Sequence, residues 1–245
     1  MTKYNAPIDE FNFLLHDFLQ ISNQNIQSFN ELNKSFTNEI FEMAGKLAKE
    51  ILLPINRSGD VEGCRIENGQ VFTPKGFVEA FEKLRKDGWT SIDCNEEFGG
   101  QNLPISISIL LGEIFSSCNI SLTIYQALTH GAYGAIFKHG TKKQKNLYLP
   151  KLASCQWTGT MNLTEPHCGT DLGLIKTRAK KITKEKYYIS GQKIFISSGD
   201  HDLAENIIHL VLAKIEGAPS GIKGLSLFIV PKFLSNEDGI LKNRN

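Results

Sequence analysis

Apolar residues recur at helical spacing through residues 1–155, and this period predicts an essentially all-helical N-terminal region. A cluster of Phe and Leu at 11–19 has this spacing, and so does the stretch from Thr37 to Leu53, where Pro54 is expected to stop the helix. A loop rich in Gly and Asn follows, with a short two-stranded element expected at 64–72. The first part of the chain therefore predicts helices joined by loops.

Four further helices are predicted before the pattern changes. They are expected at 74–87, 104–117, 121–139 and 142–149. The first should begin with Thr73 as its N-cap and Pro74 at the first helical position. Thr141 should cap the last of them, and Pro150 should end it.

After Thr158 the apolar pattern alternates, and glycines separate the apolar runs. These runs predict strands at 157–164, 175–182, 186–189, 192–196, 207–212 and 225–230. Several short strands in about 75 residues favour a small antiparallel sheet, barrel or sandwich. The expected fold is therefore multi-domain α and β, with a helical domain at 1–155 and a β domain at 156–245.

Composition excludes some functional classes. The 245 residues are 41% hydrophobic and 22% charged, with a net charge of +1, which argues against a nucleic-acid partner or an anionic membrane. The five cysteines are scattered without a CxxC pair, so neither a zinc site nor a disulfide framework is expected. The N-terminus lacks the pattern of a signal peptide, and no apolar stretch approaches the roughly 18 residues of a membrane span, so a cytoplasmic location is expected.

The stretch from Trp157 to Gly173 changes character halfway along its length. It begins as an alternating strand, is broken at Glu165-Pro166, and continues as a turn-rich loop of sequence HCGTDLG. A strand that ends in such a loop presents backbone N–H groups beside hydroxyl donors. That combination suits a phosphate or the polar edge of a planar cofactor.

Two motifs carry a family resemblance. The segment MNLTEPHCGTD resembles the T-E-P-x-x-G-[ST]-D signature of the FAD-dependent acyl-CoA dehydrogenases, and YYISGQKIFISSGDHD resembles their second signature. The order of a helical region, the first signature and then a β region also fits. Within the family, the chain resembles a large bacterial subfamily that includes 3-methylmercaptopropionyl-CoA dehydrogenase.

The resemblance assigns residues of the first signature to a flavin site. It implies that Met161, Leu163 and Thr164 lie along the pyrimidine side of FAD. Gly169 would allow close backbone approach, and Thr170 would donate to a phosphate or bind the CoA side of the substrate.

Residues of the second signature would complete the site. Phe195 would stack on the flavin ring, where many relatives carry Trp, and Ser197 would place a hydroxyl near flavin N5, where many carry Thr. Two acids of the first signature are expected to brace the loop rather than to catalyse: Glu165 by hydrogen bonding and Asp171 by capping.

The implied reaction is α,β-dehydrogenation of an acyl-CoA thioester, with hydride transfer to FAD. An electron acceptor such as an electron-transfer flavoprotein is the implied partner, and the full-length form is expected to be a homo-oligomer. The base of this family is a glutamate on a C-terminal helical domain, and nothing in the chain matches it, so no catalytic residue is assigned. The chain is therefore expected to be a fragment with an incomplete β domain, which binds FAD weakly and does not turn over.

Two alternatives remain open. The chain could be a non-catalytic remnant of the fold that binds acyl-CoA or a protein. It could also belong to a flavin oxidase or monooxygenase built on the same scaffold.

Overall fold

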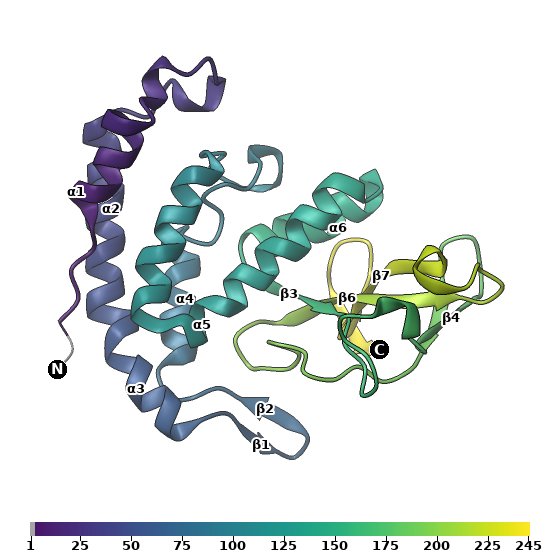
Figure 1. Ribbon diagram of the computed structural model, residues 1–245. Coiled ribbons are helices and arrows are strands. Elements are labelled where there is room, and N and C mark those ends of the chain that lie inside the picture. The colour runs from purple at the N-terminus through teal and green to yellow at the C-terminus, as the bar shows by residue number, and fades with distance from the viewer. Residues whose placement is uncertain (1–2) are drawn as a thin grey trace. The chain divides into compact units, whose positions relative to one another are not determined.

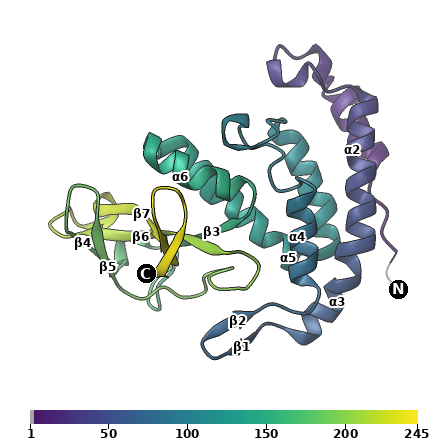
Figure 2. The ribbon, with the colours of Figure 1, turned by 180° about the vertical axis from the view of Figure 1, so that it is seen from behind.

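The structure is a computed structural model that describes residues 3–245, and it divides into two compact units (Figures 1 and 2). The first runs up to Gln126 and includes His201–Leu203, and the second comprises Ala127–Asp200 with Ala204–Asn245. Helices dominate the first unit and a sheet dominates the second, which confirms the predicted order of a helical region followed by a β region.

The helical unit is built from a small set of elements. They are α1 (Ile8–Asn12), a π-helix at Phe13–Phe18, α2 (Lys34–Leu47), a π-helix at Ala48–Leu52, α3 (Leu53–Glu62), α4 (Phe77–Lys86), the first part of α5 (Ile105–His139) and three short 3-10 turns, at Ile21–Asn23, Gln27–Phe29 and Glu96–Phe98. Phe41, Phe81 and Leu52 are completely buried at its core. A hairpin of β1 (Arg65–Glu67) and β2 (Gln70–Phe72) confirms the two-stranded element expected there.

Pro54 does not stop the helix as the sequence predicts. It lies at the start of α3, directly after the π-helical turn at Ala48–Leu52. In that turn the N–H of Leu53 bonds the carbonyl of Ala48, five residues back. The wider hydrogen-bond spacing accommodates a residue that lacks an N–H, so α2 and α3 follow one another (Figure 1).

Thr73 is also not the predicted N-cap, because α4 begins three residues after Pro74. The hydroxyl and N–H of Thr73 instead donate to Asp202 Oδ1, at 2.7 and 3.0 Å. Gly76, at φ +89°, takes the N-cap position without a side-chain hydrogen bond. Thr73 therefore bonds Asp202, which is distant in sequence, and does not cap α4.

Helix α5 joins the two predicted apolar helices, with Asn119 as a non-helical residue between them (φ −160°, ψ 84°). The Asn119 side chain accepts from the N–H of Leu122 and so caps the second half. By length and composition α5 could cross a membrane, which the sequence reading did not anticipate. Its kink and the 44% burial of its most apolar window are compatible with a core helix.

The second unit contains α6 (Lys142–Ala153) and a mixed sheet. Thr141 caps α6 as predicted, and the structure adds a capping box with Gln144. Pro150 does not end the helix, which continues for one more turn because Leu152 and Ala153 are buried. Pro150 cannot donate a backbone hydrogen bond to the helix, and the burial of Leu152 and Ala153 offsets this loss.

Strand β6 (Asn206–Ile215) is the centre of the sheet. It pairs in parallel with β3 (Trp157–Asn162) and with β4 (Arg178–Lys181), and antiparallel with β7 (Leu225–Pro231). Strand β5 (Tyr187–Ser190) adds antiparallel to β4. The expectation of a purely antiparallel sheet is therefore wrong: the long connections from β3 and β4 to β6 permit parallel pairing.

The remaining elements of the second unit are short. A hairpin of β8 (Phe233–Ser235) and β9 (Leu241–Arg244) follows β7, and 3-10 turns occur at Leu172–Leu174 and Gly221–Gly224. The glycine in β3 allows the sheet to approach α5: a Cβ on Gly159 would lie 2.4 Å from that of Ala132. No helical domain follows the sheet in the part of the chain that the structure describes.

Candidate functional site: the loop after strand β3

The loop after β3 is closed by local hydrogen bonds. Glu165 and Cys168 exchange backbone bonds at 2.8 and 3.1 Å and form a tight turn around Pro166. Asp171 then caps the 3-10 turn by accepting from the N–H of Gly173 at 2.9 Å. This confirms the bracing role predicted for Asp171.

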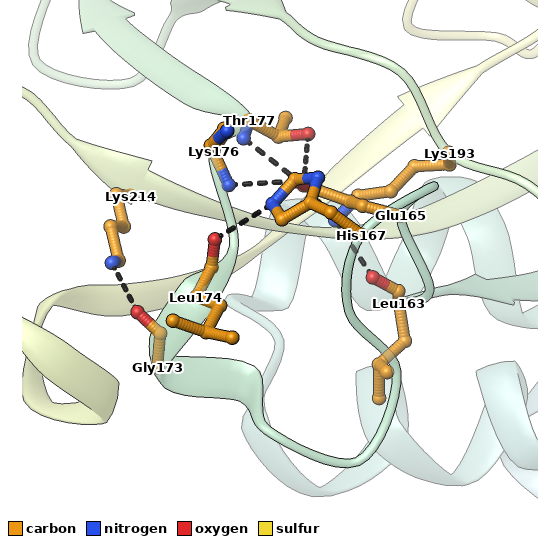
Figure 3. Close-up of polar contacts among 9 residues, drawn as sticks. All are labelled: Leu163, Glu165, His167, Gly173, Leu174, Lys176, Thr177, Lys193 and Lys214. Atoms are coloured by element: carbon orange, nitrogen blue, oxygen red, sulfur yellow. Dashed lines mark hydrogen bonds and ion pairs between the residues drawn. The ribbon is translucent and has the colours of Figure 1, made fainter.

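Glu165 is the centre of a buried polar network (Figure 3). Its carboxylate accepts from the N–H of Lys176 at 2.7 Å, and from the N–H and hydroxyl of Thr177 at 3.0 and 2.5 Å. The ammonium of Lys193 lies 2.9 Å from Glu165 Oε1. Only 3% of Glu165 is exposed, so the predicted hydrogen-bonding role is confirmed.

These contacts determine the protonation state of Glu165. Burial alone raises the pKa of this carboxyl, but the hydrogen bonds from Thr177, Lys176 and Lys193 outweigh it and lower the pKa to about 2. The carboxylate is therefore charged at neutral pH and forms a buried ion pair with Lys193. A carboxylate with so low a pKa is a poor general base.

Lys193 joins the two signature segments. Its ammonium also donates to the carbonyl of Leu163 at 2.9 Å, and the N–H of Ile194 donates to the carbonyl of Thr164 at 3.0 Å. Residues from the two motifs, 28 positions apart, are thereby held together. Sequence reasoning assigned no role to Lys193 or Thr177, although Lys193 is the lysine of the second signature.

Phe195 is displayed on the surface in a strained conformation. Its side chain is 88% exposed and its φ is +54°, a region that bulky residues rarely adopt. This left-handed residue explains why the strand predicted at 192–196 does not form. Ser197 is exposed beside it, and the hydroxyl of Ser198 is buried without a hydrogen-bond partner in the described part of the chain.

The other predicted site residues differ in their exposure and in their contacts. Met161, at the end of β3, is 40% exposed. Gly169 lies against the methyl group of Thr164, since a Cβ there would be 3.7 Å from Thr164 Cγ2. Thr170 is exposed on the loop. The hydrogen bonds thus bring Leu163, Thr164 and Phe195 together, whereas Thr170 lies further along the loop.

A carboxylate, an imidazole and a thiol gather at Glu165, His167 and Cys168, with ligand atoms within 4.8 Å of one another. Two of these groups are already engaged. Lys193 is paired with Glu165, and His167 Nε2 donates to the carbonyl of Leu174 at 3.0 Å. Because a carbonyl can only accept, Nε2 carries a proton and is not available to a metal.

The second unit also contains an open cavity of about 1120 Å³. Its lining includes Tyr148 of α6, His209 of β6 and Phe228 of β7. None of the site residues predicted from the sequence lines this cavity. The predicted flavin contacts are therefore not part of the wall of this cavity.

Comparisons with known proteins identify the family. The N-terminal domain of acyl-CoA dehydrogenases matches residues 37–156, and the middle domain matches residues 160–244. The chain belongs to the acyl-CoA dehydrogenase family. The first signature lies at the start of the middle-domain match, and the second lies within it.

Curated members of the family cover most of this chain. The 3-methylmercaptopropionyl-CoA dehydrogenase of Ruegeria pomeroyi is 40% identical over 99% of this chain, which spans 41% of that protein. A butyryl-CoA dehydrogenase of Syntrophomonas wolfei is 38% identical over 79% of this chain and 32% of its own length. The chain thus spans about two fifths or less of these two acyl-CoA dehydrogenases.

Solved structures agree with this assignment. Butyryl-CoA dehydrogenase from Megasphaera elsdenii superposes with a TM-score of 0.65 at 25% identity, over 82% of this chain and 49% of that one. An acyl-CoA dehydrogenase from Bacillus anthracis, complexed with FAD, gives a TM-score of 0.64 at 26% identity, over 83% of this chain and 32% of that one.

Proposed function

We propose that this chain forms the cofactor-positioning part of an FAD-dependent acyl-CoA dehydrogenase. The observation that carries the proposal is the pairing of the two signature segments by Lys193 and Ile194. This pairing places Leu163, Thr164 and Phe195, three residues of the predicted flavin surface, on adjoining segments. Two relatives are named as dehydrogenases of acyl-CoA thioesters, which supports an acyl-CoA as the substrate class.

The residues present fit a flavin. An isoalloxazine ring needs an aromatic or apolar surface and polar groups along one edge. Phe195 presents an exposed aromatic face, and Thr164 and Ser197 offer hydroxyl groups. Ser198, which follows Ser197 in the chain, adds a buried hydroxyl without a partner among the described residues.

The chain's own contribution to the reaction is placement. FAD, when bound, supplies the hydride acceptor. Lys193 fixes the carbonyl of Leu163, and the Glu165 network holds the loop that carries Gly169 and Thr170. Rigid placement of this kind contributes to catalysis because it reduces the entropy lost when reactants are aligned.

We infer that the proton acceptor for the α carbon lies outside residues 1–245. Glu165 is the acid nearest to the predicted flavin contacts in the sequence, and its four donors and low pKa make it unsuited to take a proton at neutral pH. Asp171 is engaged as a cap. Supply of that carboxylate by another part of the full protein is consistent with the share of the relatives that this chain spans.

Titration of the 245-residue chain with FAD tests the proposal. We expect saturable quenching of flavin fluorescence with weak affinity, and no bleaching of bound FAD when an acyl-CoA such as butyryl-CoA is added. Failure to bind FAD, together with saturable binding of butyryl-CoA, would support a non-catalytic remnant instead. Rapid bleaching by butyryl-CoA would show that a base is present within the chain.

The oxidase alternative needs a separate measurement on the full-length protein. Release of hydrogen peroxide during oxidation of an acyl-CoA would favour an oxidase. Transfer of electrons to an added acceptor dye without peroxide would favour a dehydrogenase.

A further inference from the structure

Positive charge is concentrated on the hairpin of β4 and β5. Residues 176–186 contain six lysine or arginine side chains and one carboxylate, a net charge of +5, whereas the whole chain carries +1. All six basic residues are exposed: Lys176, Arg178, Lys180, Lys181, Lys184 and Lys186. The rest of the chain therefore has a net negative charge, and this hairpin is a local exception.

The strand geometry aligns three of these cations. Thr177 and Ala179 are buried, whereas Lys176, Arg178 and Lys180 alternate with them and are exposed. Side chains two apart on a strand lie on the same face, roughly 7 Å from one another. Arg178 and Lys180 of β4 therefore lie on one face of the hairpin, and the exposed Lys176, two residues before β4 begins, continues the same alternation.

Tyr188 adds an aromatic group to this row. It is the register partner of Lys180 on β5 and is 71% exposed. Figure 2 shows β4 and β5 side by side in the sheet. We call the surface formed by Lys176, Arg178, Lys180 and Tyr188 the cationic face.

The cationic face is not neutralised from within the described chain. None of its three basic side chains forms an ion pair with residues 3–245. The face is also anchored at its base, because the backbone N–H groups of Lys176 and Thr177 both donate to Glu165. A row of unpaired cations thus begins at a backbone segment that is bonded to the loop of the first signature.

We propose that the cationic face is a docking surface for a protein with an acidic surface. Carboxylates on the surface of a folded partner complement a row of cations, and this complementarity speeds association. Tyrosine and arginine are enriched at the energetic centres of protein interfaces, and both are present here. Nucleic acid is the weaker candidate because three cations would neutralise only about three phosphates, and it is one outcome of the test below.

Binding of poly-L-glutamate to the 245-residue chain tests the charge complementarity without requiring FAD. The test variant is K176Q/R178Q/K180Q, and the matched control is K46Q/K49Q/K142Q, which removes the same charge from exposed helical positions. We expect the test variant to weaken binding about tenfold or more at low salt, and the control to change it less than about twofold. Salt near 0.5 M should remove the difference.

The partner class is tested with the same two variants. Vesicles of phosphatidylcholine and phosphatidylserine, and a short DNA duplex, should bind more weakly than poly-L-glutamate and without dependence on the cationic face. Equal loss of poly-L-glutamate binding in both variants would overturn the proposal, as would tighter binding to the vesicles or the DNA that depends on Arg178. Circular dichroism of both variants verifies that they fold.

Tyr188, the aromatic residue of the cationic face, is tested by a separate variant. Tyr188→Ser keeps every charge and removes the exposed ring. It should weaken binding of a folded acidic protein such as calcium-free calmodulin more than binding of flexible poly-L-glutamate. An equal effect on both probes would contradict a role for Tyr188 at a protein interface.

Discussion

The Glu165 network and the Phe195 segment adjoin one another in the second unit but are built in opposite ways. Glu165 is nearly completely buried, and its carboxylate has four hydrogen-bond donors. Phe195 is almost completely exposed and adopts a backbone conformation that is unfavourable for its side chain. The chain thus buries the polar interactions of Glu165 and leaves an aromatic group uncovered on the adjoining segment.

The contrast between the Glu165 network and Phe195 separates a stabilising role from a ligand-binding role. A buried, satisfied network is rigid and stabilises the fold, whereas a strained and exposed group contributes little to stability and is retained for another reason. Substitutions in the network should therefore change folding, and substitutions of Phe195 should change ligand binding.

Replacement of Glu165 should have the largest effect. Glu165→Gln leaves the ammonium of Lys193 buried without its counter-charge, and we expect a loss of about 3 kcal/mol in the free energy of unfolding. Denaturation by urea measures it, with the exposed Glu185→Gln as the control, which should change stability by less than about 0.5 kcal/mol. A loss equal to that of the control would show that the network does not stabilise the unit.

Acid should reproduce part of this loss in the unchanged chain. The folded-state pKa of Glu165 is about 2 and the reference value is 4.5, so its contribution is present above pH 4.5 and is lost as the pH falls toward 2. The shift corresponds to about 3 kcal/mol. Unfolding measured between pH 6 and pH 2 should show this slope, and Glu165→Gln should reduce it.

Lys193 should affect both stability and ligand binding. Lys193→Met removes the bonds to Glu165 and to the carbonyl of Leu163, and we expect a loss of about 2 kcal/mol in stability. We also expect FAD affinity to fall at least about tenfold, because the two signature segments are no longer held in register.

Two comparisons make the Lys193 prediction specific. Lys193→Arg should recover part of the FAD affinity, whereas Lys181→Met, at an exposed position of β4, should change neither property. Normal FAD affinity in Lys193→Met would refute the positioning role.

Phe195 should behave in the opposite way. Phe195→Ala should change stability by less than about 0.5 kcal/mol and yet abolish or strongly weaken FAD binding. Phe195→Gly should be more stable than Phe195→Ala by about 1 kcal/mol, because glycine accepts the positive φ. Phe81→Ala, at a fully buried phenylalanine, serves as the contrast and should cost about 3 kcal/mol or more.

Sequence patterns predicted the features that depend on local periodicity and local caps. The order of helices and strands, the N-cap at Thr141 and the cap at Asp171 all depend on residues within a few positions of one another. The hydrogen-bonding role of Glu165 was also predicted, but its partners were not. Thr177 and Lys193 are 12 and 28 positions away, and no local pattern pairs them with Glu165.

The wrong predictions share a cause, because at each position tertiary structure or backbone geometry overrode local preference. Pro54 is accommodated by a π-helical turn, Thr73 is drawn to Asp202, and Phe195 takes a left-handed φ where the apolar run predicts a strand. The parallel pairing of β6 likewise depends on connections too long for a local pattern to reveal.

The hairpin between the two signature segments has a consequence for the order of folding. Chain segments close short loops before long ones, and β4 and β5 form a local hairpin that brings Thr177 and Gly191 into contact. Once the hairpin exists, the loop that must close to bring Lys193 to Glu165 is about half of the 28 positions that separate them in sequence. We therefore expect hairpin substitutions such as Ala179→Gly to slow refolding, and Lys193→Met mainly to accelerate unfolding, as stopped-flow kinetics would measure.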